Sequence, residues 1–504
     1  MSTLFSIYNR SRTILKSPVL LLVPLLLLAG LGIRLYDLTD LPNDFYLVRQ
    51  YRGLIMARAL YYRFLPDAPA WQRQVTEAQW KQAGLIEPPI LESLVALTYR
   101  IIGEHIWVGR FYSSLFWVAG ALAIWLLARE MNASHGGTLA VAYFLFNHFG
   151  IIASRTFMPD PLMVSLILWS IWALYRWEQR RSWQTALFAG LLLGLAILVK
   201  SVAVFILLGA AIGMVLSRGS LKQSLADPQA WTIVGLTVVP TLLYYFYGIF
   251  VVGTLGGQFA LRFFPALIVD PSFYARWLFL AAGLAGFAAF LASLAGIFFL
   301  EKTTRWMLLG AWGGYVLFGI SFAYHFLTHD YYHLPLLGIV ALGLIPLGEV
   351  LFEKISAFPA WRQAAVVLIL LLAVAMRAWL ARNDLAVHDY RHEVAYWKAL
   401  GERIGHETPF IELSGDYGSR LVYFGWVVTH EWPSLADIKV RQLAGQEPLP
   451  FEQLFAEYTQ GMRLFVITSL PELDNHPELR DYLNAYYPLL EQSEDGYLIY
   501  DLRP

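Results

Sequence analysis

The chain contains no cysteine among its 504 residues, which excludes disulfide bonds and thiolate metal sites. Charged residues are scarce, at 15%, and cancel to a formal net charge of zero, which argues against nucleic acid as a partner. Hydrophobic residues instead make up 58% of the chain, more than a soluble protein of this length can bury. The composition therefore predicts an integral membrane protein.

Long apolar runs recur along the first three quarters of the chain, and a run of roughly 20 apolar residues is enough to cross a bilayer as a helix. The sequence predicts about eleven spans, the first of them retained because it lacks a small-residue cleavage site. They lie at about 17–36, 107–127, 136–153, 161–177, 183–199, 201–217, 230–250, 276–299, 306–326, 332–350 and 363–381. Lys200 separates the fifth from the sixth, which we read as two short helices.

Basic residues in the short loops predict the orientation. With the N-terminus in the cytoplasm, every cytoplasmic connection carries Arg or Lys, whereas the opposite short loops carry few. An odd number of spans then puts the C-terminal segment outside. We therefore expect a multi-pass protein of the plasma (inner) membrane with an extracytoplasmic C-terminal domain.

Two segments are too polar to be spans. The loop 37–106 contains a predicted interfacial helix, Tyr46 to Phe64, with apolar and arginine-bearing sides. The tail 382–504 alternates a helical pattern at 394–404 with strand-like runs at 410–413, 464–468 and 497–500. The expected fold class is a polytopic α-helical membrane protein. Its membrane domain is 1–381, with 37–106 as a large extracytoplasmic first loop, and a small soluble α/β domain is 382–504.

This topology gathers polar side chains on the extracytoplasmic face, although they come from separate loops. They are Asp44, Arg49, Arg52, Glu87, Arg155, Asp160, Lys200, His329, Asp330, Tyr331 and Tyr332. Unselected loop charges would scatter to both faces, so the pattern predicts one external pocket that carries chemistry.

Two carboxylates in this set have alternative interpretations. Asp44 follows the rigid Leu41-Pro42 and could accept a proton from an attacking hydroxyl, or it could cap the helix that follows. Asp160 begins a span, where its negative charge matches the helix dipole. That role is compatible with a second role in the pocket.

The cations and the aromatic loop also leave alternatives open. Lys200, between two apolar runs, would cost ~3 kcal/mol at the bilayer centre, so it either reaches the interface or holds an anion such as phosphate. Arg155 is either an interfacial anchor paired with Asp160 or a phosphate-binding fork. The loop from His329 to His333 suits hydrogen bonding to a sugar or phosphate, interfacial anchoring or metal ligation. No third metal ligand is apparent, so no metal or other cofactor is predicted.

Several stretches together resemble a known family. They are Glu87-Pro88-Pro89-Ile90, Ile106 to Ser114, Ala153 to Pro161, Gly190 to Ala196 with Lys200, and His329 to Pro335. In this order and on one face, they resemble the type C glycosyltransferases that use polyprenyl-phosphate sugars. The resemblance is to the bacterial branch with protein O-mannosyltransferases and lipid A aminoarabinose transferases (glycosyltransferase family 39-like).

The resemblance implies roles for these residues. Asp44 would be the general base and Asp160 a second acidic residue near the acceptor. Lys200 and Arg155 would face the donor phosphate, and the loop from His329 to Tyr332 would close over the donor.

One position departs from the family. Many relatives have Lys-Pro where this chain has Glu87-Pro88, so a phosphate contact would have to come from Arg49 or Arg52. This reversal of charge puts aminoarabinose chemistry in doubt.

The expected activity is transfer of a sugar from a polyprenyl-phosphate donor to a hydroxyl of a protein, lipid or glycan acceptor, with inversion. The alternatives are a transporter or flippase of a lipid-linked substrate and a non-catalytic envelope scaffold. The spans other than the Lys200 region carry few ionisable residues and show no repeated half, which disfavours a transporter.

Overall fold

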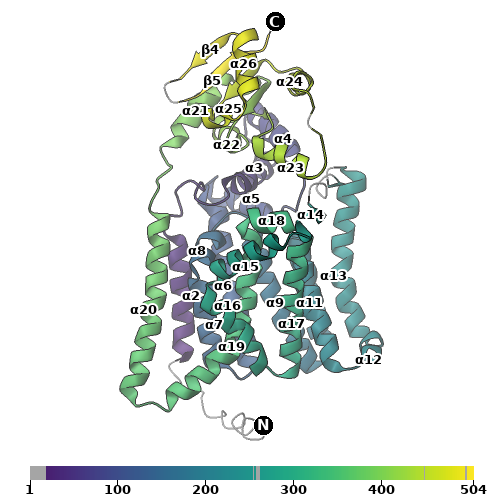
Figure 1. Cartoon of the computed structure of the whole chain (residues 1–504), viewed down its shortest axis with the longest axis vertical. Helices are drawn as coiled ribbons and strands as arrows, with labels where there is room; N and C mark the ends of the chain where they lie inside the picture. Colours follow the sequence, from purple (N-terminus) through teal and green to yellow (C-terminus); the bar gives the residue numbers. More distant parts are fainter. Residues whose placement is uncertain (1–18, 254, 257–261, 448, 494–495, 504) are drawn as a thin grey trace. The chain divides into compact units, whose positions relative to one another are not determined.

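The computed structural model describes residues 19–253, 255–256, 262–447, 449–493 and 496–503 (Figure 1). The chain divides into two compact units. The first, here called the helical unit, comprises 1–38, 110–255 and 265–387. The second, the loop–tail unit, comprises 39–109, 256–264 and 388–504. The first loop therefore groups with the tail, whereas the sequence-based division at residue 381 assigned it to the membrane domain. That the tail is a soluble extracytoplasmic domain stays a prediction.

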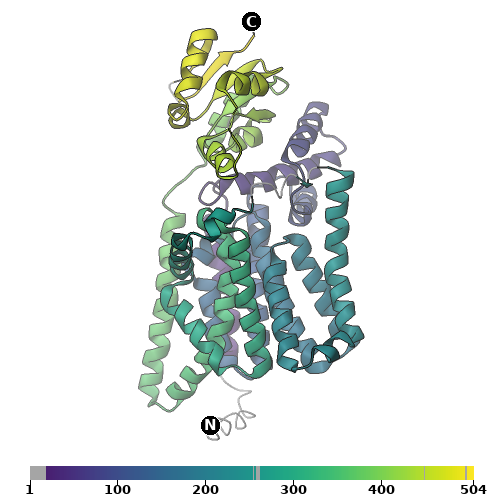
Figure 2. The same cartoon turned by 45° about the vertical axis from the view of Figure 1, so that its right-hand side comes forward.

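The helical unit is built from helices that run roughly side by side (Figures 1 and 2). They are α2 (Val19–Leu35), α6 (Trp107–Glu130), α7 (Ser134–Phe146), α8 (His148–Ser154), α9 (Pro159–Arg180), α10 (Trp183–Val199), α11 (Ala203–Arg218), α12 (Leu221–Leu225), α13 (Pro228–Phe246), α14 (Pro265–Ile268), α15 (Pro271–Ala285), α16 (Phe287–Gly296), α17 (Lys302–Ser321), α18 (Ala323–Thr328), α19 (Leu334–Ser356) and α20 (Ala360–Leu385). A π-helical turn η3 (Tyr247–Val251) and the 3-10 turns η5 (Ile297–Phe299) and η6 (Asp330–His333) complete it. Each predicted span coincides with a helix or a broken helix.

Fewer helices qualify as complete membrane spans than the eleven predicted. Within the described residues, four are long and apolar enough to cross a membrane: 107–130, 228–251, 330–356 and 360–385. Two broken helices raise the number to six if each is one span. The exact number of spans stays a prediction.

The breaks have local causes. Between α7 and α8 the chain bends by 61° at Asn147, whose side-chain oxygen accepts a hydrogen bond from the Gly150 amide and caps α8. Between α15 and α16 it bends by 94° at Gly286, whose φ of 83° favours glycine. Lys200 ends α10, so 183–217 forms two helices as predicted.

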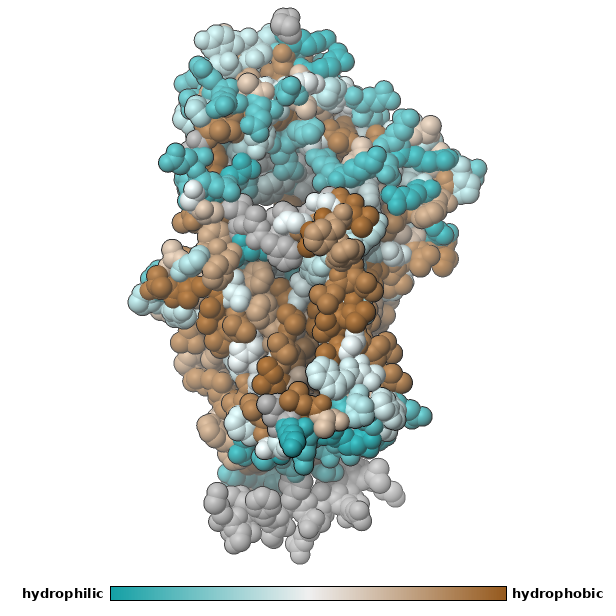
Figure 3. All heavy atoms as spheres, turned by 90° about the vertical axis from the view of Figure 1, so that its right-hand side faces the viewer, coloured by the Kyte–Doolittle hydropathy of each residue, from teal (hydrophilic) through white to brown (hydrophobic). Residues whose placement is uncertain are grey.

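Close packing in the bundle depends on small residues. Helices α11 and α17 approach so closely that a Cβ on Gly209 would meet the Gly310 carbonyl oxygen at 2.1 Å, and a Cβ on Gly310 would meet that of Gly209 at 1.9 Å. The outward side chains are apolar: Val234, Val238, Leu242 and Phe246 of α13 are exposed. Figure 3 shows this apolar surface on one face. A bundle with an apolar exterior is the arrangement expected in a bilayer.

The loop–tail unit combines helices of the first loop with a mixed sheet. Its elements are α3 (Leu47–Arg63), α4 (Ala70–Ala83), α5 (Ile90–Ile102), α21 (Glu393–Ile404), β1 (Phe410–Leu413), α22 (Ser419–Gly425), β2 (Thr429–Glu431), α23 (Leu435–Leu443), α24 (Phe451–Thr459), β3 (Leu464–Ile467), α25 (Leu470–Asp474), α26 (Pro477–Tyr486), β4 (Leu489–Gln492) and β5 (Leu498–Asp501). The strand order is β2-β1-β3-β5-β4. Strands β2, β1 and β3 pair in parallel, and β5 and β4 are antiparallel.

The predicted strand-like runs coincide with β1, β3 and β5, and the predicted helices with α3 and α21. The pattern missed β2, which has only three residues, and β4, which is mostly exposed. Neither offers the alternation by which a half-buried strand is recognised.

The first loop and the tail are joined by a buried arginine of α3. Arg58 donates to Glu104 at 2.8 Å, and its guanidinium lies 3.6 Å from the centre of the Tyr423 ring and 4.3 Å from that of Trp426. Both rings belong to the tail. Stacking of the Arg58 guanidinium on these two rings stabilises the contact between the two segments.

Candidate functional site

Asp44 lies exposed in a turn that leads into α3. The turn is held from beneath by the buried Gln50, whose side-chain amide donates to the carbonyl oxygens of Pro42 at 3.1 Å and Phe45 at 2.6 Å. The N-cap of α3 is Tyr46, with φ 43° and no side-chain capping bond. The N-cap position thus belongs to Tyr46 and not to Asp44. Asp44 itself is exposed, so a substrate could reach it.

Residues of the tail surround the Asp44 turn. The side-chain amide of Asn43 donates to Glu393 at 3.4 Å, and the backbone amide of Tyr390 donates to Asp40 at 3.0 Å. Burial raises the pKa of the Tyr390 hydroxyl, and the negative charges of Asp44, Glu393 and Asp40 raise it further. The tail thus places Glu393 and Tyr390 beside the turn of the predicted base, and its arginines Arg420 and Arg391 pair with Glu393 and Asp40.

The predicted phosphate-binding arginines of α3 are both engaged. Arg49 donates to Glu87 at 2.9 Å, and these two side chains are 22% and 15% exposed. Arg52 donates to the carbonyl oxygen of Gly84 at 2.7 Å. Glu92, buried beside them in α5, has its pKa raised to about 7 by burial, and the charge of Glu87 adds to the effect. Two arginines and two carboxyl groups thus form a compact charged cluster in the loop–tail unit.

In the helical unit, Lys200 and Asp160 form a buried ion pair. The Lys200 ammonium donates to both carboxylate oxygens of Asp160, at 2.8 and 2.9 Å, and the side chains are only 7% and 2% exposed. Asp160 stands in the first turn of α9, where the helix dipole favours a negative charge, and Lys200 stands just beyond the end of α10. The sequence reading offered Arg155 as the partner of Asp160, but the structure pairs Asp160 with Lys200.

Two tyrosines complete the surroundings of Lys200. The ammonium lies 5.0 Å from the ring centre of Tyr331 and 5.3 Å from that of Tyr332. Both rings are buried. Of the polar residues predicted from sequence, the helical unit therefore brings Asp160, Lys200, Tyr331 and Tyr332 together.

Arg155 contacts a different part of the chain, the segment that follows α2. It is buried at the end of α8, and its guanidinium donates to the backbone carbonyl of Asp37 at 3.0 Å. Arg110, also buried, donates to the neighbouring Leu38 carbonyl at 3.3 Å. These two arginines hold the segment that leaves α2, where Asp37 has a φ of 48°.

The remaining residues of the aromatic loop differ in burial: His329 and Asp330 are half-buried and His333 is buried. His329 bonds to the Thr328 hydroxyl at 2.8 Å, and Asp330 begins η6. His333 is fully buried and contacts the Tyr315 hydroxyl at 2.6 Å and the Phe326 carbonyl at 2.9 Å. His333 is thus engaged on both ring nitrogens, which argues against its pairing with His329 on a metal. Among the described residues, no group of three or more His, Cys, Asp or Glu could hold a metal ion.

The predicted polar residues thus fall into two groups. Asp44, Arg49, Arg52 and Glu87 belong to the loop–tail unit, and Arg155, Asp160, Lys200, His329, Asp330, Tyr331 and Tyr332 to the helical unit. That a single pocket unites the two groups stays a prediction.

Sequence reasoning missed Gln50, Glu92 and Tyr390. A glutamine inside an arginine-rich helix carries no distinctive signal. Glu92 had one weak signal, a carboxylate on the helix face that Leu91, Val95 and Tyr99 bury. Tyr390 lies some 350 positions from the turn it contacts, and no local pattern predicts that contact.

Comparisons with known proteins agree with this architecture. Residues 86–245 match the family model described as dolichyl-phosphate-mannose-protein mannosyltransferase. Among solved structures, ArnT from Cupriavidus metallidurans bound to undecaprenyl phosphate is similar, with 13% identity and a TM-score of 0.62 over 95% of this chain and 97% of that one. Its apo state gives 12% identity and a TM-score of 0.58 over the same shares of the two chains.

A second fold relative is archaeal. The oligosaccharyltransferase of Archaeoglobus fulgidus in its apo form gives 14% identity and a TM-score of 0.52, over 90% of this chain and 70% of that one. No curated protein sequence matches the chain. At these identities the structural matches establish the fold.

Proposed function

We propose that this chain moves a sugar from a polyprenyl-phosphate donor to an acceptor hydroxyl. The match of residues 86–245 to the mannosyltransferase family model and the ArnT-like fold support this proposal, as does the predicted resemblance to type C glycosyltransferases of the protein mannosyltransferase and aminoarabinose transferase superfamily. Two relatives support the donor class. ArnT was solved bound to undecaprenyl phosphate, and the archaeal oligosaccharyltransferase was solved with a dolichol-phosphate and an inhibitory peptide. The acceptor is a protein, a lipid or a glycan.

The proposed reaction is a single displacement. The acceptor oxygen attacks the anomeric carbon and the bond from that carbon to the phosphate oxygen breaks, so the electron pair leaves with the polyprenyl phosphate. The acceptor proton passes to Asp44. One displacement inverts the anomeric centre and needs no second carboxylate as nucleophile. The exposure of Asp44 on a turn fixed by Gln50 is the observation that supports this role for it.

We assign the donor phosphate first to Arg49 and Arg52. The ion pair of Arg49 with Glu87 is partly exposed, so exchanging that carboxylate for a phosphate costs little. A guanidinium presents paired N–H donors that match phosphate oxygens, and it would stabilise charge on the leaving group. Glu87 then occupies Arg49 in the absence of donor and competes with the phosphate for it.

Lys200 and Arg155 are the second candidates for the phosphate. Contact between Lys200 and a phosphate requires that its buried pair with Asp160 opens. For this reason we give Asp160 the role of holding Lys200, with Tyr331 and Tyr332 over the ammonium. His329 and Asp330 would contact the sugar.

The proposed reaction takes place on the extracytoplasmic side of the plasma membrane. The N-terminus would be cytoplasmic, because the predicted cytoplasmic connections carry the excess of Arg and Lys. Both the first loop and the tail would then face the periplasmic or external side, where the donor headgroup is presented.

The deciding experiment is replacement of the base. Mass spectrometry of envelope lipids and glycans from cells with and without the chain first identifies the donor and the product. With that donor, Asp44→Asn in the purified full-length protein is expected to reduce transfer by about 10²–10⁴-fold while donor binding is retained.

The matched control is Asp67→Asn, which makes the same change in another exposed turn of the loop–tail unit and should leave transfer unchanged. A normal rate in Asp44→Asn would refute the base assignment. Passage of a lipid-linked substrate across vesicles without covalent change would favour a transporter.

A further inference from the structure

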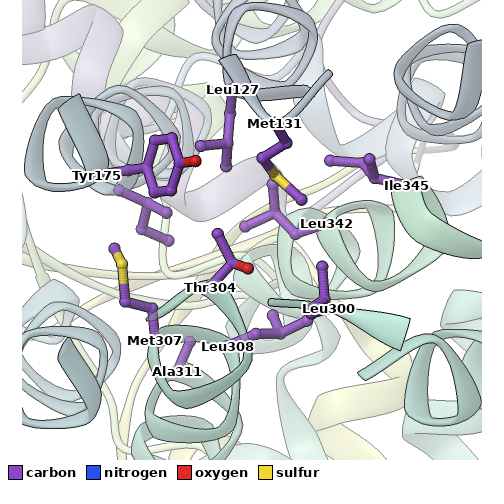
Figure 4. Close-up of a pocket in the computed structure, with 11 residues that line it drawn as sticks. Leu127, Met131, Tyr175, Leu300, Thr304, Met307, Leu308, Ala311, Leu342 and Ile345 are labelled. Atoms are coloured by element: carbon purple, nitrogen blue, oxygen red, sulfur yellow. The ribbon is translucent and has the colours of Figure 1, made fainter. Parts of the chain in front are cut away.

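Apolar packing fixes the helices α6, α9, α17 and α19 of the helical unit against one another. Leu127, Tyr175, Met307 and Leu342 are among the side chains that converge between these helices (Figure 4). They leave a space of about 30 Å³, which is too small for a sugar or an acyl chain. The turn that carries Asp44, in the loop–tail unit, is held differently, by polar contacts with the tail.

A short segment at the start of the tail runs beside the segment that precedes Asp44. The Arg391 guanidinium donates to the Thr39 hydroxyl at 3.1 Å and lies 3.7 Å from the Asp40 carboxylate. The backbone amide of Tyr390 donates to the same carboxylate at 3.0 Å. The tail therefore contacts the start of the turn through its backbone and through a side chain.

Asp40 is the first junction between the two segments. It is buried, and its Oδ1 atom accepts hydrogen bonds from the backbone amides of Leu41 at 2.8 Å and Tyr390 at 3.0 Å. One oxygen atom thus joins the turn to the tail. Because both donors are backbone groups, this junction fixes the course of the main chain where the turn begins.

Asn43, the residue before Asp44, forms the second junction. Its side-chain oxygen accepts a hydrogen bond from the hydroxyl of the buried Tyr51 at 3.1 Å, and its amide nitrogen donates to Glu393 in α21 at 3.4 Å. Glu393 is in turn held by an ion pair with Arg420 at 2.8 Å. Asp44 therefore follows a residue whose side chain is anchored at both ends.

We propose that Asp40 and Glu393 are positioning residues for Asp44, so that the tail takes part in sugar transfer by orienting the base. This inference rests on the proposed function. Among residues 40–45, Asp44 is the exposed one, so the backbone of the turn, more than packing around the side chain, sets its direction. A general base must lie within hydrogen-bond reach of the proton it accepts, and a displacement of about 1 Å can slow a reaction about a hundredfold.

The test measures sugar transfer by the full-length protein with the donor identified from envelope lipids. Asp40→Ala removes the acceptor of both backbone bonds, and we expect kcat to fall about ten- to a hundredfold while the KM for the donor stays the same. Asp40→Asn keeps an oxygen that can accept both bonds and should retain most of the rate. General distortion of the unit would also raise the KM, because Arg49 and Arg52, assigned to the donor phosphate, belong to it.

Glu393→Ala tests the second junction from the side of the tail. It removes the acceptor of the Asn43 amide, and kcat should fall about fivefold, the factor that one ordinary hydrogen bond supplies. The matched control is Glu402→Ala, the same change on the same helix at a side chain that is 77% exposed, and it should leave kcat unchanged. Thermal unfolding in detergent shows whether each variant is folded, and Glu393→Ala decides the question if Asp40→Ala is not.

A double-variant cycle shows whether the two residues act through the base. Asp40→Ala and Glu393→Ala should have no further effect on the residual transfer of Asp44→Asn, because no base remains to be oriented. The same loss in both backgrounds would overturn this inference, as would a normal kcat in the two folded single variants, and neither result touches the proposed reaction. A normal rate in Asp44→Asn alone is the separate result that refutes the base assignment and this inference with it.

Discussion

The two units each pair a predicted phosphate-binding cation with a carboxylate, but they do so in opposite environments. In the helical unit, Lys200 and Asp160 are almost fully buried and bond through both carboxylate oxygens. In the loop–tail unit, Arg49 donates to Glu87 at 2.9 Å, and both side chains keep contact with solvent. A buried pair cannot lose one member without leaving an uncompensated charge, whereas a partly exposed pair can. The difference indicates which cation can turn to a substrate phosphate.

This comparison favours a division of labour. Arg49 can exchange Glu87 for a donor phosphate at a small cost in free energy, so this ion pair can open when the donor binds. Lys200 is held in one geometry beneath Tyr331 and Tyr332, so its pair fixes the ends of α9 and α10 relative to the aromatic loop. The sequence predicts that both cations bind the donor phosphate. Their different environments indicate that Arg49 binds the phosphate and that Lys200 has a structural role.

The largest expected effect tests the buried pair. Lys200→Ala leaves the Asp160 carboxylate buried and unpaired, and we expect it to lower the free energy of unfolding by about 3–5 kcal/mol. The double variant Lys200→Met with Asp160→Leu should recover most of this loss, because two apolar side chains of similar size need no partner. Thermal unfolding of the three proteins in detergent measures both changes.

Sugar transfer by the stable double variant then decides what the pair does. Loss of transfer in a protein of normal stability would mean that the charges act in the reaction. Retained transfer would make the pair purely structural, and an unstable double variant would contradict the burial argument itself.

The next effect tests Glu412, a buried carboxyl group of the sheet that forms no ion pair with a described residue, unlike Asp160. Glu412 in β1 accepts a hydrogen bond from the Thr468 hydroxyl at 2.7 Å, and its second oxygen is buried without a partner among the described residues. Burial, together with the negative charge of Asp416, raises the pKa of Glu412 to about 8. The folded chain therefore keeps a proton on Glu412 at pH values where the unfolded chain, with the ordinary pKa of 4.5, does not.

The sign of the pH dependence follows from that proton. The contribution of Glu412 to stability is complete below pH 4.5, falls as the pH rises, and is lost above about pH 8. The total change is on the order of a few kcal/mol. Glu412→Gln cannot ionise, so it should flatten the dependence between pH 5 and 8, measured by limited proteolysis of the tail in the full-length protein. An unchanged slope in this variant would show that Glu412 does not carry the proton; Glu431, whose pKa burial also raises to about 8, is the next candidate.

The apolar runs of the sequence were enough to predict where the helices lie, because hydrophobic length is a local property. The breaks at Asn147 and Gly286 were not predicted, although Asn is a common helix cap and Gly readily adopts a positive φ. Inside long apolar runs those signals are outweighed by hydropathy. A cap or a glycine therefore becomes informative only once the packing on either side of it is known.

The residue types of the candidate site were predictable, but their partners were not. Asp160 and Lys200 are 40 positions apart, and Arg49 and Glu87 are 38. No local pattern pairs residues at such separations. The sequence identified cations and carboxylates expected on one face. Only the fold shows that Lys200 pairs with Asp160 inside the bundle and that Arg155 donates to a backbone carbonyl.

The smallest expected effect on stability tests the exposed pair. Arg49→Gln and Glu87→Gln should each change the free energy of unfolding by less than about 1 kcal/mol, because solvent screens a partly exposed ion pair. Their effects on the reaction should differ in sign. Arg49→Gln removes a phosphate ligand and should raise the KM for the donor, whereas Glu87→Gln removes the competitor for Arg49 and should lower it.

The same loop–tail unit supplies the control for that difference. Arg63 and Glu77 form a comparable pair, at 2.9 Å, between α3 and α4, with side chains 37% and 45% exposed. Arg63→Gln makes the same change in charge on the same helix and should leave the KM unchanged. If Arg63→Gln raised the KM as much as Arg49→Gln, the effect would be general attraction of an anionic lipid to a basic loop. If Glu87→Gln raised the KM, Glu87 would orient Arg49 for the donor. The proposed competition between Glu87 and the donor phosphate for Arg49 would then be refuted.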